Sequence, residues 1–304
     1  MKVVLFCGGM GMRVNDGVTS APRPMAMVGE RPLLWHVMRY YAHFGHTEFI
    51  VCLGYGAAYV KDFFLNYDET RSNDFVLENG AREVKLFKTD ISGWRITCVD
   101  TGLTSPIGVR LRRVRRFVED EPMFLANYAD VLTNARLPDM IERFEASSAV
   151  IGLLAVPPQS SHHVVDIADD GFITSVTAVQ DLRQWENGGY FLMRPEIFDH
   201  LAEGEDLVED AITRLVPEGR VLAYPYKGYW SPAETVKERV QLEEMYHRGT
   251  CPWMVWDPER SGTTPPVDAD LPYVVYQGRA VTDPVSAGGC VAVPSGMATT
   301  VRNG

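Results

Sequence analysis

The beginning of the chain sets the strongest limit on the fold. Val3–Cys7 is an unbroken apolar run, and Gly8, Gly9 and Gly11 follow at once. A run that is apolar at every position is typical of a strand buried on both faces, as in the middle of a parallel sheet. Glycines after such a strand let backbone N–H groups approach a phosphate closely, although a tight turn without a ligand would carry the same glycines. The turn is not a Walker A loop, because no Gly-Lys-Ser/Thr sequence follows it.

Buried strands and helices alternate along much of the remaining chain. Further buried strands are predicted at 49–53, 123–130 and 150–156, and helices at 32–44, 57–67, 137–146 and 235–248. Residues 84–99 alternate apolar and polar positions, which favours antiparallel or edge strands. Strand–helix alternation indicates a parallel sheet with right-handed crossovers. We therefore predict an α/β fold with a doubly wound, mostly parallel but mixed, Rossmann-like sheet, and a nucleotide at the carboxyl ends of its strands.

The charge balance argues against two classes of partner. Lysine and arginine together number 29 against 40 aspartate and glutamate residues, which gives a formal net charge of −11 at pH 7. An acidic chain is a poor general binder of nucleic acid or anionic membranes, although local arginines and backbone N–H groups can still hold a phosphate. The apolar run at 3–7 is too short for a signal peptide or a membrane span. We expect neither a nucleic-acid nor a membrane partner.

The cysteines indicate a reducing compartment. Hydrophobic residues make up 46% of the chain and charged residues 23%, an ordinary globular balance that needs no disulfides to form a core. The five cysteines are widely spaced and form no CxxC or zinc pattern: Cys7, Cys52, Cys98, Cys251 and Cys290. Reduced and mostly buried thiols in a cytoplasmic protein are therefore expected.

A second group of motifs gives the glycine-rich turn a context. Arg13 follows the turn, and then come Ala21-Pro22-Arg23-Pro24-Met25 and the stretch Val28–His36. These residues resemble the sugar-1-phosphate nucleotidyltransferases, closest to the glucose-1-phosphate cytidylyltransferase branch. That branch carries Gly-Gly-x-Gly-Thr-Arg, Arg-Pro-Lys-Pro-Met and Gly-x-Pro-Ile-Leu-Trp-His. The likeness continues in the same order at 52–56, 94–97, 99–102, 110–114, 187–191, 228–230 and 252–256.

The resemblance implies a domain organisation. It covers residues 1–256, which we expect to form one nucleotidyltransferase domain with a nucleotide half at about 1–150 and a sugar-binding half at about 151–256. Proline and glycine increase from about residue 257, and helical spacing disappears. Residues 257–304 are therefore expected to be an irregular appendage or tail, with strand character only at 273–276. Relatives are commonly homo-oligomers, so we expect a homo-oligomer by analogy.

The resemblance also implies the reaction and the residues that carry it. A nucleoside triphosphate and a sugar 1-phosphate would react by in-line displacement at the α-phosphorus, which requires positive charge, Mg²⁺ and positioning but no covalent nucleophile. The residues that match the family motifs are Phe6, Gly8, Gly9, Gly11 and Arg110 for the nucleotide; Arg13, Arg23 and Asp130 for catalysis; Asp130 and Glu234 for the metal; and Trp185, Asn187 and Gly188 for the sugar.

Departures from the family pattern concentrate on the sugar side. The Glu-Lys-Pro segment, whose lysine holds the sugar phosphate in the family, is replaced by residues 175–181, and no lysine lies between Lys88 and Lys227. Arg23 stands for a lysine, Glu234 stands for an aspartate, and Ala129 stands for a glycine beside Asp130. Met12 replaces the threonine of the loop. We interpret these changes as a retargeted sugar pocket on a retained nucleotide pocket, with CTP favoured by the resemblance.

Other interpretations remain open at this point. Asp130, at the end of a predicted strand, could equally be the N-cap of a helix. For Trp185, packing in the core is as plausible as a contact with the sugar. Most of the arginines at 110–116 are expected on a solvated helix face. His36, His43 and His46 fall near helical spacing but have no acidic partner in register, which favours packed or surface histidines over a metal site. The alternative functions are a non-catalytic nucleotide- or sugar-nucleotide-binding relative and, less favoured, a glycosyltransferase.

Overall fold

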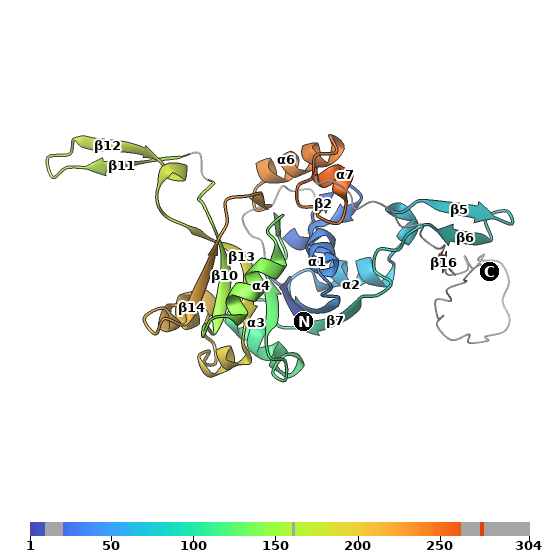
Figure 1. Ribbon diagram of the computed structural model, residues 1–304, viewed down its shortest axis with the longest axis horizontal. Coiled ribbons are helices and arrows are strands. Elements are labelled where there is room, and N and C mark those ends of the chain that lie inside the picture. The colour runs from blue at the N-terminus through green and yellow to red at the C-terminus, as the bar shows by residue number, and fades with distance from the viewer. Residues whose placement is uncertain (10–20, 160–161, 263–273, 277–304) are drawn as a thin grey trace. The chain divides into compact units, whose positions relative to one another are not determined.

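The computed structural model describes residues 1–9, 21–159, 162–262 and 274–276 (Figure 1). Contacts along the chain define two compact units. The larger unit comprises Met1–Leu65 with Trp94–Thr264, and the smaller unit comprises Asn66–Gly93 with Pro265–Gly304. The domain boundary predicted near residue 256 stays a prediction.

A seven-stranded sheet forms the centre of the larger unit. Its strand order is β14-β10-β13-β8-β1-β4-β7. Their bounds are β1 Lys2–Phe6, β4 Glu48–Leu53, β7 Arg95–Asp100, β8 Phe124–Asn127, β10 Ile151–Val156, β13 Glu186–Met193 and β14 Val221–Pro225. Only β13 runs against its two neighbours, and the other four neighbouring pairs are parallel. The predicted mostly parallel, mixed sheet is confirmed.

This topology gathers six strand ends at one edge of the sheet. Because β13 alone is reversed, its first residue lies at the edge where the other six strands end. The glycine turn after β1, Asp130 after β8 and Asn187 at the start of β13 therefore belong to the same edge. Ligands of open α/β sheets bind at this carboxyl edge, which makes it the place to look for a site.

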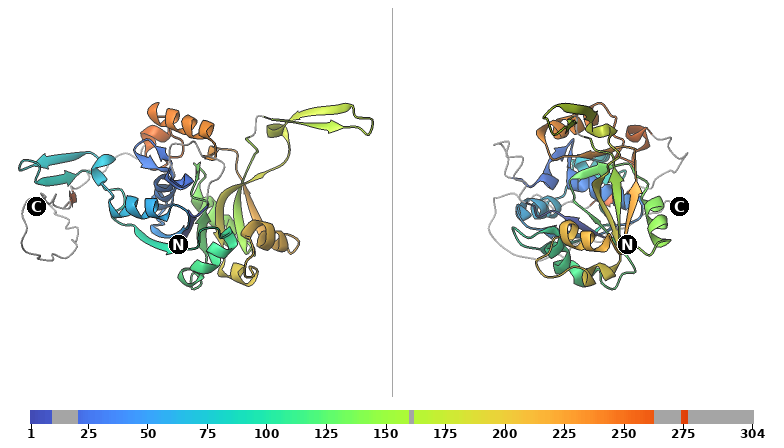
Figure 2. Two further views of the ribbon diagram at one scale, coloured as in Figure 1. Left: turned by 180° about the vertical axis from the view of Figure 1, so that it is seen from behind. Right: turned by 90° about the vertical axis from the view of Figure 1, so that its left-hand side faces the viewer.

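Helices cover both faces of the sheet, and the core has two halves. Side chains of β1 alternate between them: Val3 and Leu5 pack into one buried cluster, and Val4 and Phe6 into the other. The first cluster includes side chains of α1 (Leu33–His43) and α4 (Leu137–Glu145), and the second includes side chains of α3 (Ile107–Val114). Figure 2 shows the sheet between these layers. The apolar run at the start of the chain is thus buried on both faces, as expected.

The remaining helices of the larger unit are shorter or lie at its periphery. They are η1 Arg23–Met25, α2 Ala57–Leu65, η3 Arg115–Phe117, η4 Val179–Asp181, η5 Pro195–Asp199, the π-helical turn η6 Leu207–Ile212, α5 Thr213–Leu215, α6 Val236–His247 and α7 Pro258–Ser261. The predicted late helix at 235–248 is confirmed as α6. It begins with a capping box between Thr235 and Glu238.

Three two-stranded sheets accompany the central sheet. They pair β2 Met27–Val28 with β3 Arg31–Pro32, β9 Val131–Thr133 with β15 Trp230–Pro232, and β11 His163–Ile167 with β12 Ile173–Ala178. The β9–β15 pair is central to the site because it joins segments about a hundred residues apart in the chain. Among the residues that the structure describes, no helix has the length and apolar character that a membrane crossing requires.

The smaller unit contains a three-stranded antiparallel sheet in the order β16-β6-β5. Its elements are η2 Glu69–Arg71, β5 Phe75–Glu78, β6 Glu83–Leu86 and β16 Val274–Tyr276. The antiparallel pairing of β5 with β6 agrees with the alternating pattern of this region. β16 corresponds to the strand character expected at 273–276, and it pairs with β6.

Candidate active site

A strained turn after β8 carries the carboxylate of Asp130. Ala129 has a φ of +66°, a left-handed conformation that favours glycine. Its N–H donates to the Asn127 side chain at 2.6 Å, which stabilises the turn. Asp130 follows with 7% of its surface exposed, and burial raises its pKa from 3.8 to about 6, although the Arg23 guanidinium opposes this shift. Asp130 is therefore a buried strand-end carboxylate and caps no helix in this structure.

Arg23 lies between the two predicted metal ligands, Asp130 and Glu234. Its Nε is 3.6 Å from Oδ2 of Asp130, and its Nη1 is 3.8 Å from Oε1 of Glu234. The Glu234 side chain is half exposed, whereas that of Asp130 is largely buried. The structure thus brings together three predicted site residues that are far apart in the sequence.

The β9–β15 pairing positions Glu234. Pro232 pairs with Val131, and one residue further along the Ala233 N–H donates to the Asp130 carbonyl at 3.1 Å. Glu234 comes next and lies just before α6, where its own N–H donates to the Glu238 carboxylate at 2.9 Å. The backbone of Glu234 is therefore held at both sides, while its carboxylate is free to face Arg23.

The two carboxylates fit a hard divalent cation. Asp130 and Glu234 converge on the single positive charge of Arg23, and carboxylate oxygens are the ligands that Mg²⁺ takes. Across residues 1–9, 21–159 and 162–262, no cluster of three or more histidine, cysteine, aspartate or glutamate side chains could hold a metal ion. A cation held here would need phosphate oxygens and water as its other ligands.

The glycine turn after β1 is built against Arg110. The buried guanidinium of Arg110 donates to the Gly8 carbonyl at 2.8 Å, the Gly102 carbonyl at 2.8 Å and the Thr101 hydroxyl at 2.9 Å. A Cβ at position 8 would lie 2.0 Å from Nη1 of Arg110, so a larger residue there would displace this guanidinium. Gly9 is exposed, and a Cβ there would meet no atom within 4 Å.

The remaining residues predicted to bind the nucleotide have different outcomes. Phe6 is a buried residue of β1 that packs into the core. Gly11 and Arg13 lie outside the described residues. Since Arg110 uses its donors on the carbonyls at the ends of the strands, it holds the turn in place. Its predicted contact with a nucleotide stays a prediction.

The predicted sugar-side residues have hydrogen-bond partners, of which the sequence analysis missed Tyr128. Asn187 donates to the Tyr128 hydroxyl at 3.0 Å and accepts from the Gly189 N–H at 3.0 Å. Gly188 accepts at its carbonyl from the indole N–H of Trp230 at 2.8 Å. Tyr128 lies two residues before Asp130, and this position at a strand end was the available signal. The pair of Tyr128 and Asn187 thus stands beside the Asp130 turn.

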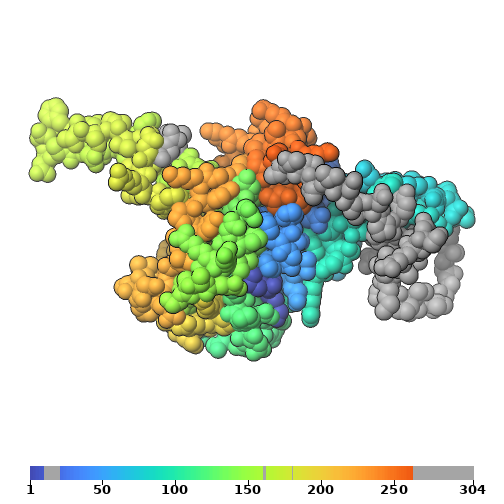
Figure 3. All heavy atoms as spheres, in the orientation of Figure 1, coloured from blue at the N-terminus to red at the C-terminus, as the bar shows by residue number. Residues whose placement is uncertain are grey.

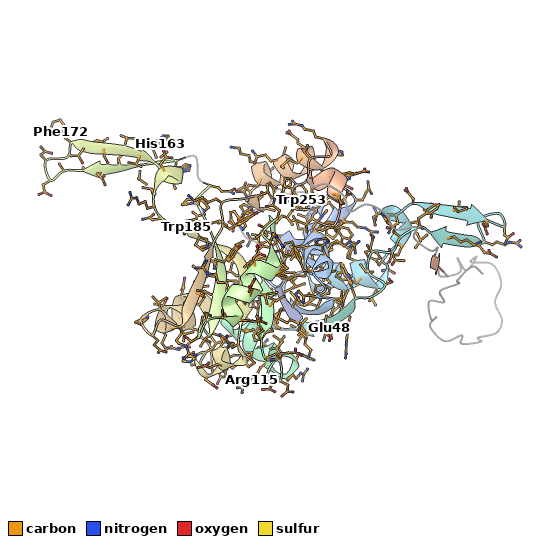
Figure 4. All side chains as sticks on the ribbon, viewed as in Figure 1. Glu48, Arg115, His163, Phe172, Trp185 and Trp253 are labelled. Atoms are coloured by element: carbon orange, nitrogen blue, oxygen red, sulfur yellow. The ribbon has the colours of Figure 1, made fainter. Side chains whose placement is uncertain are left out.

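Trp185 lies apart from the core. It is exposed, and the Lys227 ammonium group is 6.0 Å from its ring centroid (Figure 4). The structure therefore does not favour core packing for this ring, and its predicted contact with the sugar stays a prediction.

A cavity of about 510 Å³ lies between β15 and α6. It is lined by Gln159, Gly228, Tyr229, Trp230, Ser231, Gln241, Leu242, Glu244, Met245 and Arg248. None of the predicted site residues lines it. The converging side chains of Arg23, Asp130 and Glu234, rather than this cavity, define the candidate site.

Comparison with known proteins finds relatives that cover most of the chain. No family model matches the chain. The probable glucose-1-phosphate cytidylyltransferase of Bacillus subtilis is 30% identical over 258 residues, which is 84% of this chain and 100% of the relative. The glucose-1-phosphate cytidylyltransferase of Salmonella typhimurium is 29% identical over 262 residues, again 84% of this chain and 100% of the relative.

Solved structures show the same fold at low identity. A putative glucose-1-phosphate thymidylyltransferase from Bacillus anthracis superposes with a TM-score of 0.60 at 15% identity, over 81% of this chain and 94% of its own. A UDP-glucose pyrophosphorylase complexed with UDP-glucose has a TM-score of 0.60 at 16% identity, over 81% and 98%. The chain belongs to the sugar-1-phosphate nucleotidyltransferase family, a family of enzymes. Within that family it is similar along its matched length to the glucose-1-phosphate cytidylyltransferases, which confirms the resemblance of its motifs.

Proposed function

We propose that this chain transfers a nucleoside monophosphate from a nucleoside triphosphate to a sugar 1-phosphate and releases pyrophosphate. The convergence of Arg23, Asp130 and Glu234 beside the glycine turn carries the proposal. β1 and β8 are neighbours, with Leu5 opposite Asn127, so the turn and the carboxylate follow adjacent strands. The similarity to cytidylyltransferases favours CTP as the nucleotide.

The reaction is a displacement at phosphorus. An oxygen of the sugar phosphate attacks the α-phosphorus, and the bond from that phosphorus to the bridging oxygen breaks, so pyrophosphate leaves with the electron pair. Negative charge increases on the oxygens around the α-phosphorus. The Arg23 guanidinium would stabilise that charge, and the backbone N–H groups of the glycine turn would orient the phosphates.

Charge balance supports a role for Mg²⁺. With both carboxylates ionised, Asp130, Glu234 and Arg23 sum to −1, which by itself repels a triphosphate. Asp130 and Glu234 would hold the ion, and when bound it supplies positive charge that neutralises phosphate oxygens. Through that ion, Asp130 and Glu234 would also orient the phosphates of the nucleotide.

The sugar is proposed to be non-standard. Tyr128 and Asn187 offer a phenol and an amide beside the Asp130 turn, and these groups suit sugar hydroxyls. The segment 175–181, which stands where the family has its sugar-phosphate lysine, forms the end of β12 and η4 and contains no basic residue. A sugar phosphate must therefore be recognised by other groups in this chain.

Compartment and assembly complete the proposal. Cys7, Cys52 and Cys251 are buried free thiols and Cys98 is an exposed one, which suits a reducing cytoplasm. We also propose a homo-oligomer, by analogy with relatives.

The direct test is pyrophosphate release with Mg²⁺ from CTP, UTP, GTP, ATP and dTTP, each offered with several sugar 1-phosphates. Asp130→Asn should lower kcat/KM for the productive pair by a factor of about 100 or more. Asp139→Asn is the matched control, because Asp139 also pairs with an arginine, at 3.7 Å, but lies on α4 away from the site. Saturable nucleotide binding without turnover for any pair would favour the non-catalytic binding protein.

A further inference from the structure

The sugar end of the candidate site has little positive charge of its own. Arg23 already faces two carboxylates, and the Arg110 guanidinium donates to carbonyls at the ends of the strands. Tyr128 and Asn187, the groups proposed to bind sugar hydroxyls, are both neutral. A phosphate monoester carries a charge of about −1.5 to −2 at pH 7, so its binding requires a cation beyond these residues.

The segment that precedes Trp185 does not supply this cation. Residues 162–182 contain neither lysine nor arginine. Most of them form the hairpin of β11 and β12, and Figure 3 shows the atoms of this hairpin clear of the body on the visible side. Two exposed cations flank this part of the site: Arg183, just before Trp185, and Lys227, just after β14.

The central sheet brings Lys227 to the edge where Asn187 lies. Ala155 of β10 is opposite Asn187 of β13 on one side and opposite Pro225 of β14 on the other. These three residues therefore form one row across the carboxyl edge of the sheet. Lys227 comes two residues after Pro225, and Trp185 comes two residues before Asn187. Across this row, the Lys227 ammonium group lies 6.0 Å from the centroid of the Trp185 ring.

The turn that carries Lys227 is anchored on both sides. Before it, the Tyr226 N–H donates to the Ala155 carbonyl at 2.8 Å, and the Tyr226 hydroxyl donates to Oδ1 of Asn134 at 2.5 Å. After it, the Tyr229 N–H donates to the same Asn134 oxygen at 3.0 Å. The backbone around Lys227 is therefore held in place, whereas its side chain is exposed and can meet a ligand.

The contact between Lys227 and Trp185 is a resting position that an anion can replace. A cation near an exposed aromatic ring gains less free energy than a charge-assisted hydrogen bond to an anion provides. An ammonium group on a flexible four-carbon stem can leave the ring when such an anion binds. The ring then remains beside the same ligand as an apolar surface.

We propose that Lys227 is a specificity-determining residue that binds an anionic group of the sugar substrate beside Trp185. The 1-phosphate and a carboxylate on the sugar ring are the two sources of this chemistry. β13 and β14 are two strand spacings apart, about 10 Å, and the Lys227 side chain already covers part of this gap by reaching Trp185. The inference rests on the proposed function, because it places a sugar 1-phosphate at this edge of the sheet.

Competitive acetylation tests this binding without requiring turnover. The full-length protein is treated with acetic anhydride, and mass spectrometry measures the rate at each lysine. Glucose, glucose 1-phosphate and glucuronic acid 1-phosphate are the probes, each with Mg²⁺ and each nucleotide of the panel. Well above its dissociation constant, a bound sugar 1-phosphate should slow acetylation of Lys227 about tenfold. Lys61, exposed on α2 after β4, should react at an unchanged rate.

The pattern of protection decides the proposal and the anion. Protection by glucose 1-phosphate but not by glucose identifies the phosphate as the group that Lys227 binds. Protection by glucuronic acid 1-phosphate alone identifies the carboxylate. Equal rates at Lys227 with every probe, or equal protection by glucose, would overturn the proposal.

Steady-state kinetics of the productive pair provide the second measurement. Lys227→Met should raise the KM for the sugar 1-phosphate about tenfold and leave the KM for the nucleotide unchanged, because one charge-assisted hydrogen bond is lost. Lys227→Arg should restore part of the loss, Lys61→Met should have no effect, and circular dichroism checks that each variant is folded. The same rise in Arg183→Met instead of Lys227→Met would overturn the assignment to Lys227.

The two measurements separate this inference from the proposed reaction. Turnover with an unchanged KM in Lys227→Met would refute the role of Lys227 and leave the reaction standing. Protection of Lys227 without pyrophosphate release from any pair would support the role of Lys227 and refute the reaction.

Discussion

Replacing Arg110 by methionine tests whether this arginine positions the strand ends. Its guanidinium is buried and donates to the carbonyls of Gly8 and Gly102 and to the hydroxyl of Thr101, at 2.8–2.9 Å. These acceptors follow β1 and β7, so one side chain links the turns after two strands that are not neighbours in the sheet. Methionine keeps much of the side-chain volume but donates to none of them.

The magnitude follows from the acceptors that lose a donor. The Gly8 carbonyl still accepts from the Tyr55 N–H at 3.3 Å, and the Thr101 hydroxyl still donates to the Leu53 carbonyl at 2.8 Å, so the loss falls mainly on the Gly102 carbonyl. A polar group left unpaired costs about 1–3 kcal/mol, and removing a buried charge returns part of its desolvation cost, so we expect a net loss of about 2 kcal/mol in the free energy of unfolding. Equilibrium urea denaturation measures this quantity. Arg116→Met, on the exposed face of η3, should change it by about 0.5 kcal/mol or less.

Two results would count against the positioning role. A loss below about 1 kcal/mol for Arg110→Met would mean that the carbonyls find other partners. Unchanged stability together with a raised KM for the nucleotide would instead support the direct nucleotide contact predicted for Arg110 from the sequence.

Two further predictions concern buried titratable groups. The pKa of Asp130 is about 6 in the folded protein and 3.8 ordinarily, so the charged form of this side chain disfavours folding. Asp130→Asn should therefore raise the free energy of unfolding by up to about 3 kcal/mol above pH 6. The gain should vanish below about pH 4, and urea denaturation over this pH range measures it. Neutral His36 donates from Nε2 to the Val28 carbonyl and accepts at Nδ1 from the Trp253 indole, and burial lowers its pKa from 6.5 to about 4. Stability should therefore fall by up to about 3 kcal/mol as the pH drops from 6.5 to 4, and His36→Gln should flatten this dependence.

Local pattern was sufficient for much of the fold. The apolar runs that became β1, β4, β8 and β10 are buried because they lie between two helix layers, and a strand covered on both faces leaves a continuous signature. Residues 163–193 contain the hairpin of β11 and β12 and the reversed strand β13, and strand direction depends on pairing partners that no local pattern specifies.

The helix α6 shows a second limit. The helix itself was predicted correctly, but Val236 and Val240 are exposed while Leu242 is buried, so the apolar residues of this segment do not form one buried face. Helical spacing predicts that a helix forms and leaves open which of its residues meet the core. That choice depends on where β15 and the preceding chain deliver the helix.

The resemblance to the family, rather than local pattern, supplied the candidates for the site. Asp130 follows an apolar run, but that position alone would equally fit a helix cap. The approach of Glu234 depends on the β9–β15 pairing, which joins Val131 to Pro232 across the chain. Tyr128 carried the same strand-end signal as Asp130 but was overlooked, because an aromatic residue at the end of a buried strand is usually assigned to the core.

The turn at 129–130 combines two costs that a purely structural turn would avoid. Ala129 in the left-handed region costs about 1 kcal/mol relative to glycine, and ionised Asp130 costs up to about 3 kcal/mol through its raised pKa. Neither cost is needed to end β8, since a glycine and a neutral side chain would make the same turn. Such local conflicts are expected where a side chain serves function rather than folding. The coincidence of both at one turn, facing Arg23 and Glu234, is an argument for the Asp130 carboxylate as the functional centre that is independent of any likeness in sequence.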